Sequence, residues 1–215
     1  MEPQEDVNRP YRSALRARHA DTTRLLIIQA AQKLFVEYGY GATSIDAIAT
    51  EAGVARATVF TAVGGKAVLL KAAYDVALVG DDESVPLPDR PWARPVRDEA
   101  DRHRMLDLYA RVLGEIHSRT AAINEAIRGA SGADPEARLL WREVQEQRRV
   151  GARNIVMMLH AKGGLRRGLE LATAADVLAV LIEPGIYYQL VLQSGWSRTQ
   201  FEVWIAETMQ TQLLE

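Results

Sequence analysis

The Gly53-Val54 corner restricts the fold of this chain more than any other feature. It lies within EAGVARATVFTAVGGK, from Glu51 to Lys66, between two short helical patterns. A tight turn between steeply crossing helices needs a left-handed residue, and glycine adopts that conformation without a steric penalty. Two such short helices are not stable alone. We therefore predict that Val54 fixes the turn to a core built from neighbouring helices.

Helical periodicity continues on both sides of the corner. Upstream, apolar side chains at helical spacing predict one face of a helix that Gly39 ends as a C-cap; they are Ile27, Ala30, Ala31, Leu34, Phe35 and Tyr38. Thr43 or Ser44 is the expected N-cap of the next helix. Further helices are expected over residues 56–63 and 66–79.

The rest of the chain also favours helices. A proline-rich stretch over 80–99 predicts a linker or loop. Helices are then expected over 105–116, 121–128, 135–160, 173–193 (bent or broken at Pro184-Gly185) and from Ser197 onward. The prediction is an all-α protein of about nine helices. Its parts are a flexible basic arm over 1–20, a helix-turn-helix domain over 21–79 and a second helical domain over 80–215.

Charge and composition narrow the functional class. The net charge is −2, but Arg9 to Lys71 holds nine Lys/Arg and four Asp/Glu, so positive charge gathers near the N-terminus. DNA binding is compatible with such segregation. With no cysteine, disulfides, thiolate catalysis and Cys-ligated zinc are excluded. The longest apolar stretch is interrupted by Glu183 and Pro184, so we expect no membrane span and a cytoplasmic protein.

The third helix has the side chains of a DNA-reading element. Small residues let its backbone approach a large partner, and Ala and Thr contact thymine methyl groups in the major groove. Lys66, at the start of the next helix, is placed to meet a phosphate. The predicted DNA-binding residues are Arg18 of the arm with Thr43, Ala55, Arg56, Thr58, Phe60, Thr61 and Lys66. The alternative for the arm is that it is a solvated tail that does not contact DNA.

Residues 22–79 resemble the tetracycline-repressor (TetR) family of bacterial transcription regulators. The resemblance rests on matches in order and at the family's spacing: Ala30-Ala31, Phe35, Gly39-Tyr40, Thr43-Ser44, Ile48-Ala49, Gly53-Val54, Thr58 with Phe60, and Lys66. Three positions depart from the pattern. Phe60 replaces the usual Tyr, Val63 a common Phe, and Ala55 a frequent Ser, which weakens capping of the third helix.

The resemblance implies that the second domain binds a small molecule and dimerises. Polar and aromatic groups on apolar helix faces are the candidate ligand contacts: Tyr109, His117, Trp141, Gln147, Met157 and Tyr187. Two apolar stripes form the candidate dimer interface: Leu181, Tyr188 and Leu192, then Phe201, Trp204, Ile205 and Met209. For the ligand candidates, core packing or plain surface exposure is the alternative; for the two stripes, the alternative is a core within one subunit.

The leading hypothesis is a repressor. A homodimer would bind a palindromic double-stranded DNA operator and be released by an unknown small-molecule effector. We expect no metal, cofactor or catalytic residue, since the histidines show no ligand spacing and no Ser/His/Asp set or nucleophile elbow is present. An enzyme and an architectural DNA-binding protein are the alternatives. The extra helices of the second domain argue against the latter.

Overall fold

The computed structural model describes residues 9–79, 91 and 93–214, with side chains from residue 19 onward. Within these residues every regular element is helical. The chain divides into two compact units, Met1–Ala73 and Tyr74–Glu215. This boundary lies within α4 (Lys66–Val79), whereas the sequence predicts a domain boundary after residue 79.

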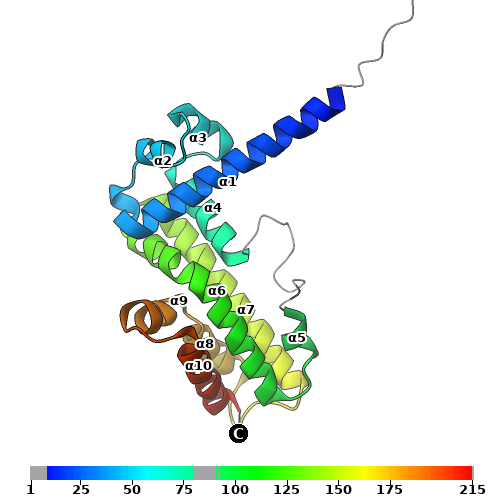
Figure 1. The fold of residues 1–215 in the computed structure, drawn as a ribbon. Coiled ribbons are helices and arrows are strands. Elements are labelled where there is room, and N and C mark those ends of the chain that lie inside the picture. Colours follow the sequence, from blue (N-terminus) through cyan, green and yellow to red (C-terminus); the bar gives the residue numbers. More distant parts are fainter. Residues whose placement is uncertain (1–8, 80–90, 92, 215) are drawn as a thin grey trace, which may run out of the picture. The chain divides into compact units, whose positions relative to one another are not determined.

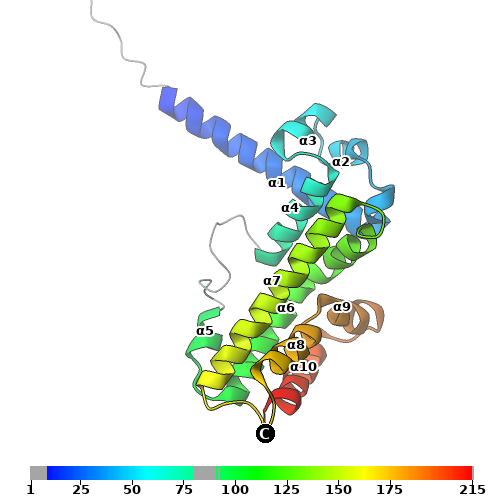
Figure 2. The same ribbon diagram turned by 180° about the vertical axis from the view of Figure 1, so that it is seen from behind.

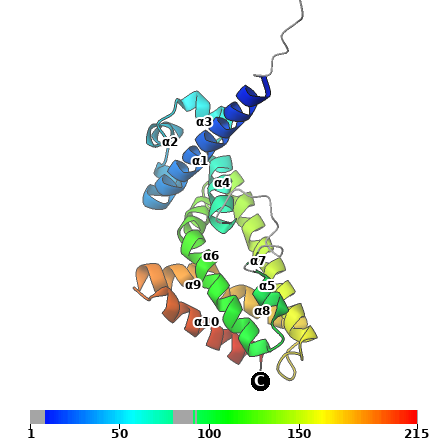
Figure 3. The ribbon, with the colours of Figure 1, turned by 45° about the vertical axis from the view of Figure 1, so that its right-hand side comes forward.

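Unit 1 is built from α1 (Arg9–Ala42), α2 (Ile45–Glu51), α3 (Arg56–Ala62) and the first part of α4. The α2–α3 corner lies against α1 (Figure 3). Gly53 has φ +67° at the turn, as predicted. The core consists of fully buried side chains from each helix: Ile27, Ala31, Phe35, Ile48, Val59, Leu69 and Leu70.

Two predictions for the N-terminal region need correction. Residues 9–20 form the first turns of α1, which extend past α2 and α3 in Figure 1, rather than an arm. The remaining arm residues, 1–8, lie outside the described part. Tyr38 is 59% exposed and so falls off the buried face. Gly39, with φ +78°, interrupts the helical backbone where the C-cap is predicted.

The caps of unit 1 follow from local side-chain chemistry. Ser44 is the N-cap of α2, and its hydroxyl accepts a hydrogen bond from the Ala47 amide at 3.1 Å. Ala55 is the N-cap of α3 without any side-chain bond, so the expected weak capping is present. α3 therefore depends on tertiary packing, chiefly through the fully buried Val59.

Unit 2 contains α5 (Ala93–Asp98), α6 (Arg102–Ala130), α7 (Pro135–Ala161), α8 (Leu171–Leu181), α9 (Pro184–Tyr187), the π-helix η2 (Tyr188–Gln193) and α10 (Arg198–Leu213). The long helices α6 and α7 lie side by side (Figures 1 and 2). α10 packs on α6, and α8 packs on α7. Their shared core includes Leu106, Leu159, Leu178, Phe201 and Ile205, all fully buried.

Two elements of unit 2 differ from the prediction, and a third has the predicted break. The separate helices expected over 105–116 and 121–128 are one helix, α6, because no helix-breaking residue lies between them. α5 lies within the stretch expected to be a loop; its proline is in the first turn, where no helical N–H bond is lost. The helix expected over 173–193 ends at Leu181, resumes at Pro184 and finishes as η2.

Candidate nucleic-acid interface and ligand cavity

The outer surface of α3 carries small side chains and one cation. Ala55, Arg56, Ala57 and Thr61 are exposed, while Val59 between them is buried in the core of unit 1. The hydroxyl of Thr61 donates to the Ala57 and Thr58 carbonyls at 3.1 and 3.2 Å. A surface of this kind lets a helix backbone come close to a base-pair edge.

Arg56, the first residue of α3, is held by two neighbours. Its Nη1 donates to Asp46 Oδ2 of α2 at 2.5 Å. Its guanidinium carbon lies 5.6 Å from the centre of the Phe60 ring, a cation–π distance. Phe60 is 45% exposed, so the ring and the guanidinium form one surface feature. Arg56 is therefore presented in a defined position at the start of α3.

Lys66, the first residue of α4, is also supported by an aromatic ring. Its ammonium lies 4.2 Å from the centre of the Tyr40 ring and 3.5 Å from the Gly41 carbonyl oxygen. Tyr40 in turn packs on Phe35, with 5.6 Å between ring centres. The sequence analysis does not find this role of Tyr40, because the two residues meet only through the fold.

Two of the predicted DNA contacts are less exposed than the prediction implies, and a third lies outside the described side chains. Thr43 is 3% exposed, and its hydroxyl donates to the carbonyls of Leu34 and Gly39, so it is a structural residue. Thr58 is half-buried. The side chain of Arg18 lies outside the described part. Arg24, which was not predicted, is exposed and donates to the Ala62 carbonyl at 2.8 Å.

Unit 2 contains a cavity of about 150 Å³ bordered by α4, α6, α7 and the α8–α9 corner. It is lined by Tyr74, Leu78, Tyr109, Leu113, Ile116, His117, Thr120, Val144, Gln147, Arg148, Gly151, Ile182 and Pro184. Three of the predicted ligand contacts, Tyr109, His117 and Gln147, are brought together here. Gln147 is exposed and donates to Glu143, so it is not the buried polar group expected from the sequence.

The other predicted contacts lie outside this cavity. Met157 is 55% exposed. Trp141 lines a separate hollow with Glu183 and Tyr188. Tyr187 is buried edge-on against His117, with 6.0 Å between ring centres, and therefore supports the cavity wall from behind. Arg148 and Tyr74 are cavity residues that the sequence analysis misses, because neither interrupts an apolar pattern.

Burial sets the protonation states in the cavity. Desolvation, helped by the charge of Arg148, lowers the pKa of His117 to about 3, so the imidazole is neutral at physiological pH. Desolvation also raises the pKa of Tyr74 to about 12 and that of Tyr109 further still. Burial lowers the pKa of Arg148, while Glu183 opposes that shift. An arginine nevertheless keeps its charge.

Nε and Nη1 of Arg148 are buried without a hydrogen-bond partner among the described residues, although Nη1 is part of an ion pair. That ion pair is with Glu183 Oε2, and Nη2 of Arg148 donates to Gln145 Oε1. The same lack of a hydrogen-bond partner holds for Nδ1 of His117, whose side chain is 3% exposed. Buried polar atoms are normally satisfied, and such exceptions mark sites for water or ligand.

The predicted dimer stripe divides into a buried half and an outer half. Phe201, Ile205 and Met209 are fully buried in the core of their own unit, so they cannot contact a second subunit. Leu181, Tyr188 and Trp204 are partly exposed, and Leu192 is largely exposed. The two stripes are therefore mostly one subunit's core, with an apolar outer edge.

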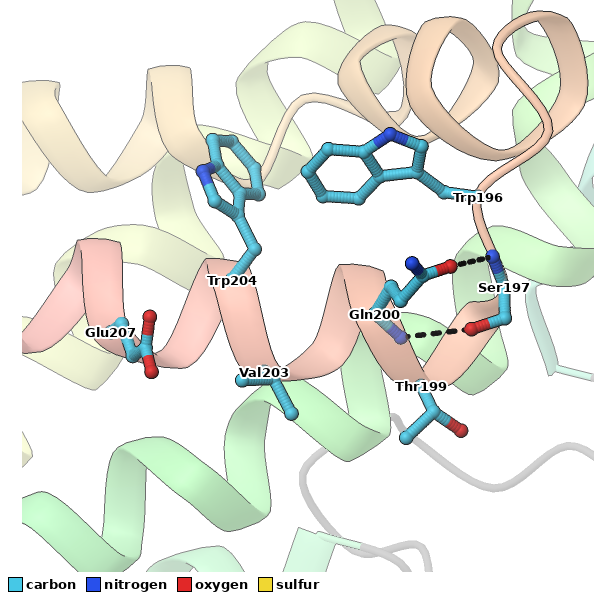
Figure 4. A pocket seen from close by; sticks show the side chains of 7 residues that line it. All are labelled: Trp196, Ser197, Thr199, Gln200, Val203, Trp204 and Glu207. Carbon is cyan, nitrogen blue, oxygen red and sulfur yellow. Dashed lines mark hydrogen bonds between the residues drawn. The ribbon is translucent and has the colours of Figure 1, made fainter.

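The outer side of α10 carries a shallow hollow of about 390 Å³. In Figure 4, Trp196 and Trp204 lie on one side of α10, and Thr199 and Val203 point away from them. The two indole rings meet edge to face with 6.2 Å between centres. Ser197 and Gln200 form a capping box that starts α10 where the sequence predicts it.

Two further kinds of site were considered, a membrane-spanning helix and a metal site. Leu171–Gln193 is long and apolar enough to cross a membrane, but this is weak evidence because core helices of soluble proteins meet the same criteria. In the described ranges no three His, Asp or Glu side chains gather in a way that could hold a metal ion.

Solved structures share the fold of the whole chain. A protein from Saccharomonospora viridis, described as a transcriptional regulator in complex with choline, is 17% identical with a TM-score of 0.66, over 91% of this chain and 99% of that one. NalD, the secondary repressor of the MexAB-OprM multidrug efflux pump in Pseudomonas aeruginosa, is 20% identical with a TM-score of 0.63, over 91% and 98%. No curated protein matches the sequence.

The sequence comparison is more specific for unit 1. Residues 27–73 match the family described as bacterial regulatory proteins, tetR family. This segment contains the α2–α3 corner, Arg56 and Lys66. Over this segment the chain is similar to the tetR family of bacterial regulatory proteins, and the solved structures show that it shares their fold.

Proposed function

We propose that this protein is a transcriptional repressor that binds a palindromic operator as a homodimer and is released by a small molecule. The observation that carries the proposal is the outer surface of α3. There, small residues lie beside Arg56, whose guanidinium contacts Asp46 and the Phe60 ring. An arginine near the start of a recognition helix can donate two hydrogen bonds to guanine in the major groove. Lys66 would neutralise a phosphate.

An exposed apolar surface supports the homodimer. Val180 of α8, Leu192 of η2 and Val203 of α10 are 67%, 51% and 54% exposed, and α10 packs on both α8 and η2. Exposed apolar side chains become favourable when a partner covers them. A twofold axis would pair the surface with its own copy and place two α3 helices on successive major grooves.

The cavity of unit 2 supports control by an effector. It is enclosed mainly by apolar groups and holds unpartnered polar atoms of His117 and Arg148. The S. viridis relative contains choline. The two units are joined through α4, which begins with Lys66 in unit 1 and supplies Tyr74 to the cavity of unit 2. An effector releases DNA only if it binds the non-binding conformation more tightly. A repressor of this type would act in the cytoplasm, where the DNA is.

The test is a selection of random double-stranded DNA with the purified protein at two salt concentrations. We expect an inverted repeat, with half-sites about one helical turn apart. The Arg56→Ala variant should lose preference at one base pair in each half-site, while Arg104→Ala, an exposed arginine of α6, should select the same sequence. Recovery of unrelated sequences whose binding disappears at moderate salt would instead favour an architectural role.

Repression needs a separate measurement. The selected operator is placed over a reporter promoter, and transcription is compared with and without the protein. A fall in transcription supports repression, and a rise would make the protein an activator. Turnover of a metabolite by the purified protein would favour the enzyme alternative.

A further inference from the structure

The cavity of unit 2 has one charged lining side chain, the cation Arg148. No lining residue is Asp or Glu. Glu183 pairs with Arg148 but borders the separate hollow beside Trp141. The other polar groups in the lining are neutral at physiological pH, including His117 and the two tyrosines. The lining therefore holds a single cation, and the carboxylate that balances its charge lies outside the lining.

The unpartnered atoms indicate where a ligand would bind. Arg148 Nε is a buried donor without an acceptor among the described residues. His117 Nδ1 is equally unsatisfied, and a neutral imidazole can carry its proton on this nitrogen and donate it. A carboxylate has two acceptor oxygens and forms its strongest hydrogen bonds with a guanidinium. A neutral ligand would offer at most a carbonyl or hydroxyl acceptor without charge, and a cationic ligand would be repelled by the guanidinium.

The dimensions limit the rest of the ligand. An engineered apolar cavity of comparable volume, about 150 Å³, holds a benzene ring. Leu78, Leu113, Val144 and Ile182 supply an apolar wall for such a body. We propose that this cavity binds a small monocarboxylic acid with a ring-sized apolar body, whose carboxylate is bound by Arg148 with help from His117. The inference rests on the proposed function only for the role of this acid as the effector.

Glu183 gives the proposal a second test, because its carboxylate competes with a ligand carboxylate for Arg148. It already neutralises Arg148 from outside the cavity. It also accepts a hydrogen bond from Asn124 Nδ2 at 3.4 Å, so it retains a partner when a ligand carboxylate shares the guanidinium. Removing the Glu183 charge should therefore strengthen acid binding, whereas removing the Arg148 charge should abolish it.

The experiment is isothermal titration of the full-length protein with three probes of one shape and different charge: benzoate, benzamide and benzamidine. We expect benzoate to bind at least tenfold more tightly than benzamide and benzamidine not to bind. Arg148→Gln should weaken benzoate binding at least tenfold, and Glu183→Gln should strengthen it several-fold. Arg149→Gln, which removes an exposed arginine of the same helix, should change nothing.

The outcomes separate cleanly. If Arg148→Gln does not fold, the three probes and Glu183→Gln still decide the question. No benzoate binding, equal binding of benzamide or benzamidine, or weaker binding after Glu183→Gln would each overturn the proposal. The titrations contain no DNA, so they hold whether or not the protein is a repressor. Benzoate that binds without changing operator affinity would support the site and refute its role as effector site.

Discussion

Arg56 and Asp46 join the first residue of α3 to the first turn of α2, with 2.5 Å between Nη1 and Oδ2. Both side chains are exposed, so the pair adds little to stability. It does hold the cation at the start of the proposed recognition helix. A phosphate or a guanine that takes up Arg56 must therefore compete with Asp46.

Asp46→Asn should tighten DNA binding. An exposed ion pair is worth up to about 1 kcal/mol, so releasing Arg56 should improve affinity about two- to fivefold at low salt. Fluorescence anisotropy with labelled DNA measures the change. The control is Glu51→Gln, which removes a charge of the same sign from α2 but releases Lys33 instead. Equal tightening by both variants would attribute the effect to net charge alone.

Lys66→Ala should weaken binding to all DNA sequences by a similar factor. A phosphate contact carries no base information, and its loss should make the slope of log affinity against log salt about one unit shallower. Anisotropy titrations at four salt concentrations give the slope. Arg166→Ala removes an exposed cation from unit 2 and should leave affinity and slope unchanged. A changed base preference in Lys66→Ala would contradict a phosphate role.

His117 should make the protein less stable in acid. Its pKa is about 3 when folded against an ordinary value of 6.5, so between these values the unfolded chain binds the extra proton. The free energy of unfolding therefore falls as the pH decreases below 6.5, by about 2 kcal/mol at pH 5 from this group. Urea unfolding at pH 7.5 and 5 should show a smaller loss for His117→Leu. His103→Asn, an exposed control on α6, should behave like the parent protein.

Gly114 of α6 allows α10 to approach closely. A Cβ at this position would lie 2.3 Å from Oε1 and 2.6 Å from Cγ of Glu202, which pairs with Arg198. Gly114→Ala should cost about 1–2 kcal/mol of stability, although alanine is ordinarily favoured in helices. Gly129→Ala on the same helix, with open space around its Cβ, should be stabilising. Rescue of Gly114→Ala by Glu202→Ala would locate the clash.

Val203→Glu should convert a homodimer to monomers. A charge in the middle of a buried apolar interface loses its hydration without a partner. Light scattering after size-exclusion chromatography gives the mass. Met157→Glu is the matched control, because Met157 is equally exposed but lies on α7. If Val203→Glu keeps the mass of the parent protein, the outer edge of α10 is not the interface.

The sequence alone determined the parts that depend on local chemistry. The glycine turn at Gly53 and the cap at Ser197 follow from the residues themselves, and the cap of α2 is restricted to Thr43 or Ser44, of which the structure has Ser44. Helical spacing predicted the all-α fold, and the ordered motif from Ala30 to Lys66 predicted the family. These features hold because each is decided within a few residues of the chain, or by a pattern repeated along one helix.

Only the tertiary structure decided which side of an apolar helix faces the core. Phe201, Ile205 and Met209 fit an interface stripe equally well, but α6 and α8 cover them within one subunit. The partnership of Arg148 with Glu183, and of Lys66 with Tyr40, likewise joins residues far apart in sequence. Periodicity records the side of a helix that is apolar, whereas burial and charge pairing depend on what packs against it.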